Sequence, residues 1–537
     1  MKPLIVLAAT VATASLPHQD GSEQLAFTLG DTQQKLQNHE QSFPGKASAI
    51  DDVLYALEVM QNTYFDLKVA TWLDAIDWTA AVMGTHVSAA LSSIVSSFHD
   101  LSRESCTELL SAQNLIDKYF SHVFVFYFGE NAFGLRNQAY DDMLWVVLGW
   151  LERLKFTEMH SRKNWKASQV SNSFTPSSPW YGLEINPLAA HRARIFYELA
   201  SKSWDESLCS GGCIWNPYLT PYKNAITNEL FASASIAMYL YWPGDENDSP
   251  FLTSFSKPHK PEHLENAIKS YTWLKESHMQ SIHSGLYGDG YHVSGWHRYP
   301  NGTTNPGTGQ CDELDEMEYT YNQGVILSAS RGLWLATGTR SYLDDGHGLV
   351  ESVIRATGWP RTDKEWRGLG RGGVLEEYCD HLGQCSQDGQ TFKGIFFLHL
   401  SEFCRPLEQY EEDFMTSHVK SGYDQDIYQY HLARCEAYGK WVAHNAAAAL
   451  ATRNDNGLFG MWWTRDDLDE DTIEKIRQTT SLPPGAFDYR NPAANLAAPE
   501  GLTKGDLNDR GRGRTVETQS GGLSVLRAHL QWQMQYS

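Results

Sequence analysis

Six stretches of the sequence are apolar or small on nearly every side of a helix, at residues 70–98, 139–156, 224–241, 319–336, 391–404 and 441–452. A helix of this kind must be surrounded by protein. Between these stretches lie helices with a single apolar stripe, such as 187–204 and 263–278, which need cover on one side only. An inner ring of the first kind inside an outer ring of the second satisfies both requirements, so we predict an all-α toroid of about six inner and six outer helices.

The composition fits one well-packed globular chain. Its 537 residues are 42% hydrophobic, and no Pro- or Ser-rich linker or fixed-period repeat divides them, so we expect a single domain over residues 15–537. A formal net charge of −22 argues against nucleic acid or an anionic membrane as a partner. The 18 Trp and 26 Tyr residues suit stacking on flat ligands such as sugars, although a large helical core also uses Trp.

The N-terminus has the features of a secretory signal peptide over residues 1–14. Lys2 is followed by an apolar stretch at 4–11 and by a small-x-small cleavage site at 12–14. An exported chain with an even number of cysteines is expected to form disulfides, and the eight cysteines that remain are Cys106, Cys209, Cys213, Cys311, Cys379, Cys385, Cys404 and Cys435. Eight cysteines allow about 105 pairings, and we expect Cys379 to pair with Cys385 because both lie in one loop. Glycosylation sequons at Asn247 and Asn301 fit a eukaryotic secretory route.

Polar and aromatic residues gather where the inner helices begin. Every inner helix of such a ring runs in the same direction, so the N-terminal ends meet on one rim. The side chains placed at those ends are Asp74, Asp77, Trp78, Asp141, Asp142, Trp145, Lys223, Asn224, Asn228, Tyr319, Tyr321, Asn322, Gln323, Asp388 and Lys393. Capping of free backbone amides explains many of the Asp and Asn residues, but not the Trp, Tyr and Lys residues. We therefore predict that this rim binds a polyhydroxylated ligand.

Asp141 and Asp142 are the candidates for catalysis because they lead straight into the apolar run of 143–148. The other Asp-Asp pairs, at 51–52, 344–345 and 466–467, lie in amphipathic or acidic stretches and are expected to be solvated. Two carboxylates beside a dry interior are costly unless they are paired or share a proton.

The spacing of this pair suits one type of glycoside cleavage. Successive helical side chains diverge by about 100°, which sets the two carboxyl carbons roughly 5 to 7 Å apart. This range overlaps the roughly 5 to 5.5 Å that a double displacement with retained configuration requires. One Asp would attack the anomeric carbon while the other donates a proton to the leaving oxygen, and the spacing does not assign the two roles.

The motifs YDDMLW, YKNAITNELF, YTYNQGVIL and GGVLEEYCDHLGQCSQDGQTFKGIFF follow the order and approximate spacing of glycoside hydrolase family 76, which the chain resembles over roughly residues 50–450. This family comprises α-1,6-mannanases and fungal wall proteins thought to transfer the glycans of glycolipid-anchored proteins. The resemblance implies an (α/α)6 barrel, a retaining mechanism and no metal or cofactor. It also implies that Asp141 is the nucleophile and Asp142 the acid/base. The positions that resemble the sugar-binding positions of the family are Asp77, Trp78, Asn224, Asp289, Tyr321, Asn322 and Lys393.

We expect a secreted, monomeric hydrolase that cuts α-1,6 linkages within mannan, outside a fungal cell or in its wall. The C-terminal LRAHLQWQMQYS lacks an apolar tail for a lipid anchor, which favours hydrolysis over the alternative of a wall transglycosidase. A third hypothesis is a non-catalytic carbohydrate-binding wall protein, against which the intact Asp pair argues. The acidic run at 311–319 lacks the spacing of a calcium-binding loop, so we expect no metal site.

Overall fold

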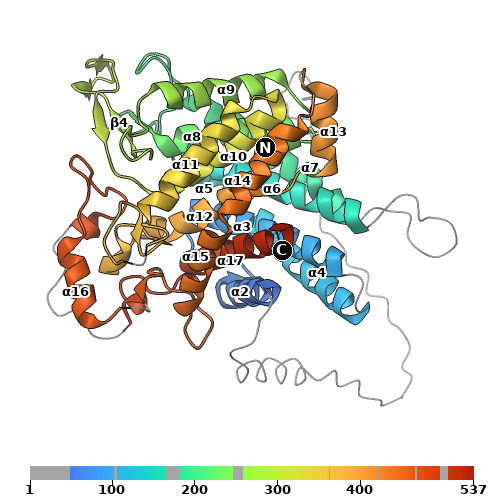
Figure 1. The fold of residues 1–537 in the computed structure, drawn as a ribbon. Coiled ribbons are helices and arrows are strands. Elements are labelled where there is room, and N and C mark those ends of the chain that lie inside the picture. Colours follow the sequence, from blue (N-terminus) through green and yellow to red (C-terminus); the bar gives the residue numbers. More distant parts are fainter. Residues whose placement is uncertain are drawn as a thin grey trace, which may run out of the picture. The chain divides into compact units, whose positions relative to one another are not determined.

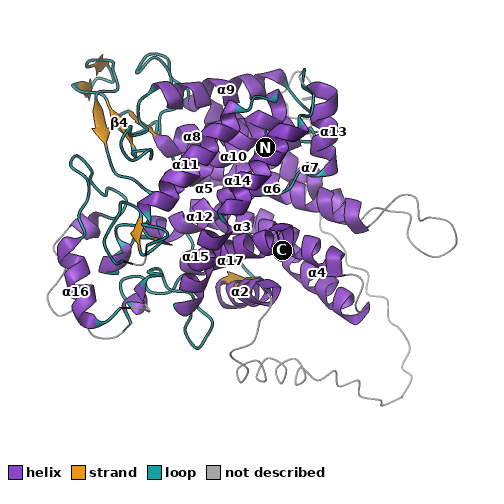
Figure 2. Cartoon of the chain, in the orientation of Figure 1, coloured by secondary structure: helices purple, strands orange, loops and turns teal. Residues whose placement is uncertain are grey.

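The computed structural model describes residues 49–101, 106–164, 181–245, 258–361, 363–420, 422–465, 468–495 and 506–536. These residues are mainly helical, with short strands between the helices (Figure 2). Residues Ser48–Ser537 form one compact unit. The expected signal peptide and the sequon at Asn247 lie outside the described residues.

Six helices contact one another in a closed ring. They are α3 (Asp77–Leu101), α6 (Tyr140–Asn164), α8 (Ala225–Tyr241), α10 (Thr320–Thr337), α12 (Gln387–Cys404) and α17 (Val516–Tyr536). Each contacts the next in this order, and α17 returns to α3, beside which it lies in Figure 1. Together with the helices that surround them, they form the (α/α)6 barrel that the sequence predicts.

The outer helices each cover one or two inner ones. α2 (Ala49–Tyr64) packs on α17, α4 (Cys106–Gly129) on α3, α7 (Asn186–Ala200) on α6, α9 (Pro261–Glu276) on α8, and α11 (Ser341–Ala356) on α10. α14 (Gln425–Ala437) contacts α12, α15 (Gly439–Ala451) packs on α17, and the shorter α13 (Gln409–His418) contacts α10. The two striped segments predicted at 187–204 and 263–278 are therefore outer helices, as expected.

The sixth inner helix is not the one that the sequence predicts. The segment 441–452 lies in α15, which buries only one side, whereas the ring is closed by α17, which is not among the six stretches predicted to be inner helices. Alanine makes α15 seem apolar all round, although alanine tolerates exposure. α17 is buried on most sides through small and polar residues, and these groups are paired inside the protein: Thr518 donates to the Phe459 carbonyl at 2.9 Å and Ser524 to the Gly394 carbonyl at 2.8 Å.

The first turns of three inner helices are joined on one rim. The Gln387 amide at the start of α12 donates to the Asp74 carbonyl and to Glu517 Oε1, both at 2.6 Å. Thr79 in the first turn of α3 donates to the same Glu517 oxygen at 3.1 Å. These bonds confirm that the N-terminal ends of α3, α12 and α17 meet.

Four small antiparallel sheets lie in the loops. The largest has the order β3 (Tyr222–Asn224), β4 (Gly290–His292), β7 (Glu313–Asp315), and its register places Asn224 opposite Gly290 and Gly290 opposite Asp315. The other pairs are β1 (Phe65–Asp66) with β2 (Thr71–Trp72), β5 (Trp296–Arg298) with β6 (Thr304–Pro306), and β8 (Gly370–Arg371) with β9 (Val374–Leu375). The turn between β5 and β6 exposes the Asn301 sequon.

Three disulfides link described segments. Cys379 pairs with Cys385, as predicted, and the two other bridges are Cys209–Cys311 and Cys404–Cys435. Cys213 is a buried free thiol. The Cys209–Cys311 bridge ties the loop before β3 to the loop before β7, beside the sheet that these strands form.

Helix α3 is long and apolar enough over Asp77–Ser97 to cross a membrane by length and composition alone. Of the most apolar window, however, 83% is buried inside the protein. Its neighbours α4, α6 and α17 account for this burial. The apolar character of α3 is therefore that of a core helix in a barrel.

Gly324→Ala is expected to lower the free energy of unfolding by about 1 to 3 kcal/mol. An added methyl group would lie 2.7 Å from the Phe396 Cα, where α10 crosses α12. Gly348→Ala on the exposed side of α11 is the matched control, because a methyl group there meets nothing within 4 Å, and we expect it to stabilise by about 0.4 to 1 kcal/mol. Urea unfolding of the three proteins measures both changes, and equal effects would contradict the close approach of α10 and α12.

Candidate active site

Asp141 and Asp142 lie in the first turn of α6, where backbone N–H groups have no helical partner. Asp142 Oδ2 accepts a hydrogen bond from the Ala139 N–H at 3.2 Å. Asp141 Oδ1 accepts from the Asp142 N–H at 3.1 Å, and its Oδ2 accepts from the Trp215 indole at 3.0 Å. Asp141 is only 6% exposed, while Asp142 is partly exposed. The helix start thus supplies the donors that two nearly buried carboxylates need.

The surroundings of the two carboxyl groups are unequal. Burial raises the pKa of Asp141 to about 6, against the lowering effect of Arg490, the Asp142 N–H and the Trp215 indole. Burial and then the charge of Asp141 raise the pKa of Asp142 well above its usual range, against the smaller effects of the Ala139 N–H and Arg490. Asp141 therefore loses its proton first as the pH rises, and Asp142 keeps the remaining proton. The pair combines one anion with one acid.

The sequence interpretation missed two residues near this pair, one that bonds to Asp141 and one that lies over the first. Trp215, in the loop before β3, donates to Asp141, and its backbone carbonyl accepts from the Tyr140 N–H at 2.9 Å. Arg490, in the loop after α16 (Glu470–Thr479), places its guanidinium carbon 4.9 Å from the centre of the Trp215 ring. The sequence marks Arg490 only by its place in the long stretch 453–522, where none of the predicted inner helices lies.

The start of α3 meets the pair from one side. The rings of Trp78 and Trp145 stack with centroids 5.8 Å apart, and Trp145 follows Asp141 by one helical turn. The Trp78 indole donates to the carboxylate of Asp388 in the first turn of α12, whose pKa is raised by burial and lowered by Arg490 and this bond. Asp77 accepts from the Gln138 amide at 2.7 Å, which anchors the loop that leads into α6.

The starts of α8 and α10 bring in a second group around Asp289. This buried carboxylate accepts from the Tyr222 hydroxyl at 2.7 Å and from the Asn322 amide at 3.3 Å. Tyr321 stacks on Phe392 with centroids 3.9 Å apart. Three buried polar atoms of this group have no hydrogen-bond partner among the described residues, and they are the Tyr321 hydroxyl, Asn322 Oδ1 and Asn224 Nδ2. Such atoms suit the hydroxyl groups of a ligand.

Lys393 is placed differently from the other predicted residues. Its ammonium group forms a buried ion pair with Asp380 and donates to the Met461 carbonyl at 2.7 Å. Burial raises the pKa of Asp380 to about 6, and Lys393 lowers it. The Lys393 donors are thus engaged in joining α12 to the segments around 380 and 461, and the structure does not bring Lys393 to the Asp pair.

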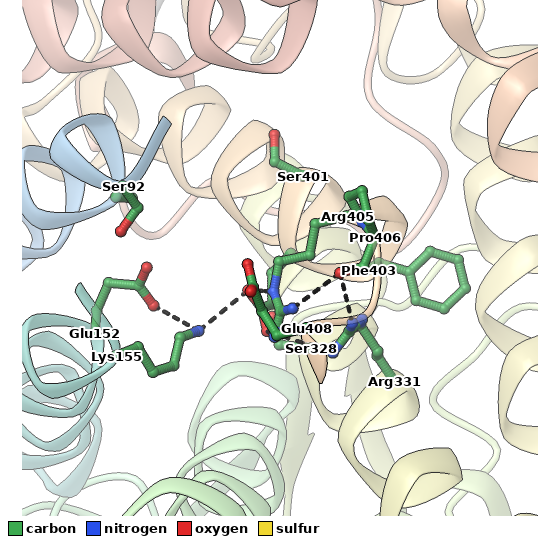
Figure 3. Close-up of polar contacts among 12 residues, drawn as sticks. Ser92, Glu152, Lys155, Ser328, Arg331, Ser401, Phe403, Arg405, Pro406 and Glu408 are labelled. Atoms are coloured by element: carbon green, nitrogen blue, oxygen red, sulfur yellow. Dashed lines mark hydrogen bonds and ion pairs between the residues drawn. The ribbon is translucent and has the colours of Figure 1, made fainter. Parts of the chain in front are cut away.

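The opposite end of the ring holds a second polar cluster, beside a cavity of about 310 Å³ (Figure 3). Lys155 lies between Glu152 at 2.7 Å and Glu402 at 3.1 Å. Arg405 bonds to both Glu402 and Glu411. Although burial raises it, Arg405, Lys155 and the adjacent Arg331 hold the pKa of Glu402 well below its usual range.

This second cluster lacks the asymmetry of the Asp pair. Each of its paired carboxylates faces at least one cation. Although burial raises them, the arginine neighbours hold the pKa values of both Glu402 and Glu411 below their usual range. Arg405 is also the C-cap residue of α12, where its charge offsets the negative end of the helix dipole. We therefore interpret it as structural, and place the candidate site on the N-terminal rim.

Comparisons with known proteins point to one family. The model of glycosyl hydrolase family 76 matches residues 190–482. Among curated proteins, Mannan endo-1,6-alpha-mannosidase DCW1 of Candida glabrata is 23% identical over 285 residues, which cover 51% of this chain and 48% of that protein. The protein of the same name from Saccharomyces cerevisiae is 23% identical over 222 residues, which cover 40% of this chain and 39% of that protein. The chain thus spans about half or less of the length of these curated relatives.

Solved structures show the same fold. The GH76A alpha-1,6-mannanase from Salegentibacter sp. HEL1_6 is 18% identical, with 90% of this chain and 99% of that chain covered and a TM-score of 0.50. The mannosidase Bt3792 from Bacteroides thetaiotaomicron VPI-5482 is 16% identical, with 90% and 98% covered and a TM-score of 0.53. The Asp pair lies before the matched residues 190–482 and Arg490 lies after them, whereas Trp215 and the group around Asp289 lie within them.

Asp141→Asn is expected to raise the free energy of unfolding at pH 7 by about 2 to 3 kcal/mol, since the pKa of Asp141 lies about two units above that of an unfolded chain. A carboxyl group with a raised folded pKa costs stability once the pH exceeds the unfolded value, and the full cost is reached above the folded value. The gain should therefore vanish near pH 4, grow as the pH rises through about 6, and grow further above that pH because the variant removes the charge that raises the pKa of Asp142. Urea unfolding at several pH values measures it, with the exposed Asp74→Asn as control; a gain independent of pH would contradict this interpretation.

Proposed function

Because the chain belongs to glycosyl hydrolase family 76, we propose that it is a retaining glycoside hydrolase that cleaves α-1,6-mannosidic bonds within mannan. The observation that carries the proposal is the unequal pair in the first turn of α6, one carboxyl group favoured as the anion and the other as the acid. The names of the curated relatives support the substrate class. An inactive variant of the Salegentibacter enzyme, with two consecutive aspartates replaced by asparagine, has been solved in complex with alpha-1,6-mannotriose, which supports the role of an adjacent pair.

In the first step Asp141 attacks the anomeric carbon of a mannose unit. The carbon–oxygen bond to the leaving sugar breaks, and Asp142 transfers its proton to that oxygen, so a covalent glycosyl ester forms on Asp141. Asp141 suits the attack because the Trp215 indole and the Asp142 N–H hold its oxygens in place. Asp142 suits the donation because the charge of Asp141 helps it to keep a proton.

In the second step Asp142 changes from acid to base because Asp141 has lost its negative charge. Once Asp141 is an ester, it no longer repels a negative charge on Asp142, and the pKa of Asp142 falls. The Asp142 carboxylate can then take a proton from water as that water attacks the anomeric carbon. The ester bond breaks, Asp141 returns as a carboxylate, and two inversions leave the configuration retained.

We assign sugar binding to the polar and aromatic groups around the pair. The Tyr321 hydroxyl, Asn322 Oδ1 and Asn224 Nδ2 are buried and lack protein partners among the described residues, so sugar hydroxyls can supply them. The partly exposed ring of Trp78, which stacks on the buried Trp145 one turn after Asp141, offers an apolar surface for a sugar ring. Asp77 and Asp289 act through the loops and side chains that they hold.

We also propose that the protein acts outside the cell or in a fungal cell wall. Three disulfides among the described residues fit an oxidising compartment. The curated relatives come from two yeasts. Immunodetection of the expressed chain in culture medium and wall fractions tests this location.

Asp142→Asn is expected to lower kcat on α-1,6-mannan by about 100- to 10,000-fold through loss of general acid and base catalysis. Asp141→Asn is expected to lower it at least as much, because no covalent intermediate can form. Released reducing ends and the chain length of the products, followed by mass spectrometry, measure the reaction. Azide should rescue the corresponding alanine variants differently. Asp141→Ala should give a mannosyl azide of inverted configuration, and Asp142→Ala one of retained configuration.

Asp344→Asn serves as the control, since Asp344 is an exposed residue that pairs with Arg340 on an outer helix. It should leave kcat unchanged. Products longer than the substrate, without a net gain of reducing ends, would instead identify a transglycosidase with the same covalent step. If the natural protein neither hydrolyses nor lengthens α-1,6-mannan, the proposed substrate is refuted.

A further inference from the structure

We propose that Arg490 is a positioning residue that lies over the Trp215 ring and keeps Asp141 in the anionic state that attacks the substrate. The inference rests on the proposed function and adds a residue that no family motif includes. Arg490 lies beyond the residues 190–482 that match the family model. Its guanidinium carbon is 4.9 Å from the centre of the Trp215 ring, and the indole of the same Trp215 donates to Asp141 at 3.0 Å.

The backbone that carries Arg490 is fixed to the rim. The Arg490 N–H donates to the Tyr319 hydroxyl at 3.2 Å, and that hydroxyl donates to Asp488 at 2.8 Å. Asn491 accepts from the N–H of Ser386, the N-cap residue of α12, at 2.7 Å. The segment is thereby bonded to the starts of both α10 and α12. Arg490 is held over the site by a rigid frame and not by its own side chain alone.

The charges around Arg490 are mostly negative. The titratable and charged groups that face Arg490 or Asp141 are Asp142 on α6, Tyr222 on β3, Asp289 before β4, Tyr319 and Tyr321 at the start of α10, and Asp388 on α12, with Arg512 beside Asp388. Burial disfavours the charged form of Arg490, but Tyr321 and the carboxylates of Asp289, Asp141 and Asp388 raise its pKa well above its usual range. Arg490 is thus a permanent cation at the site.

Arg490 acts on the two catalytic carboxyl groups unequally. After burial, it is the largest influence on the pKa of Asp141 and lowers it. On Asp142, burial, the charge of Asp141 and the Ala139 N–H all outweigh it. Among the groups that most raise the pKa of Arg490, Asp141 is present and Asp142 is not. The cation therefore favours the anionic form of Asp141 first, which is the property that the double displacement requires.

The test compares Arg490→Met with Arg490→Lys and the natural protein in kcat/KM on α-1,6-mannotetraose between pH 4 and 8. Without the cation, the lower apparent pKa of the pair should rise by about one unit, so kcat/KM should fall about tenfold at pH 5 and less than about twofold at pH 8. Arg490→Lys should restore much of the natural profile. The exposed neighbour Tyr489→Ala is the control and should keep the natural profile. A loss by the same factor at every pH would overturn the proposal, because it would indicate a merely structural role.

A second readout does not depend on activity. Without Arg490 the nearby carboxylates ionise readily in the unfolded chain but resist ionisation in the folded one, so stability is lost as the pH rises. The melting temperature of Arg490→Met should therefore lie close to that of the natural protein at pH 4 and fall progressively below it towards pH 7. A deficit that is constant with pH would overturn the proposal. If the natural protein leaves α-1,6-mannan intact while this pH-dependent loss of melting temperature is seen, the proposed substrate is wrong. The proposed effect of Arg490 on the charge of Asp141 is then still supported.

Trp215→Phe supplies a variant in case Arg490→Met does not fold. It keeps an aromatic ring under the guanidinium and removes the hydrogen bond to Asp141. The acidic limb of kcat/KM should shift in the same direction as for Arg490→Met. An unchanged acidic limb in Trp215→Phe would overturn the part of the proposal in which Trp215 connects Arg490 to Asp141.

Discussion

A carboxylate that is buried beside a second carboxylate is the constraint on which this structure depends. Removing either charge from water costs far more than one hydrogen bond returns. The chain meets this cost by placing Asp141 and Asp142 at the start of a helix, where free N–H groups and the helix dipole favour an anion. The indole of Trp215 and the cation of Arg490 further favour the anionic form of Asp141. The remaining cost falls on Asp142 and is avoided while that group keeps its proton.

The barrel makes this arrangement possible because it gathers the starts of separate helices. α3, α6 and α12 are far apart in the chain, yet Trp78 bonds to Asp388 and stacks on Trp145. Close packing at the crossings depends on residues without large side chains, such as Gly324 against the backbone of α12. The rim is therefore rigid where the polar groups lie. A rigid rim lets buried polar atoms remain unpaired within the protein until a ligand supplies partners.

The two ends of the ring treat charge differently. At the C-terminal end, Lys155 and Arg405 both pair with Glu402, and Arg405 offsets the negative end of α12. At the N-terminal rim, the carboxyl groups outnumber the cations, and protonation makes up the difference. Ion pairs of the first kind fix geometry, whereas a proton that can leave supports acid and base catalysis. The cavity of about 310 Å³ beside the C-terminal cluster is thus not the better candidate for the site.

The sequence by itself determined the class of fold and the central pair. Apolar helices alternating with striped ones require two concentric rings, and two aspartates before an apolar run require special stabilisation, so both features follow from local pattern. The sequence interpretation failed where small and polar residues share the burial with apolar ones, as in α17, whose glycine, serine and threonine residues are buried and whose Ser524 bonds internally.

Only the tertiary structure decided which side chains reach the pair. Trp215 and Arg490 lie in loops, and nothing in their local sequence fixes where a loop docks; bonds to the starts of α10 and α12 do so for Arg490. Lys393 shows the reverse case, because the partner Asp380 engages it inside the protein. Helices and buried charges obey short-range rules that a sequence displays, whereas the approach of one loop to another depends on long-range contacts that exist only in the folded chain.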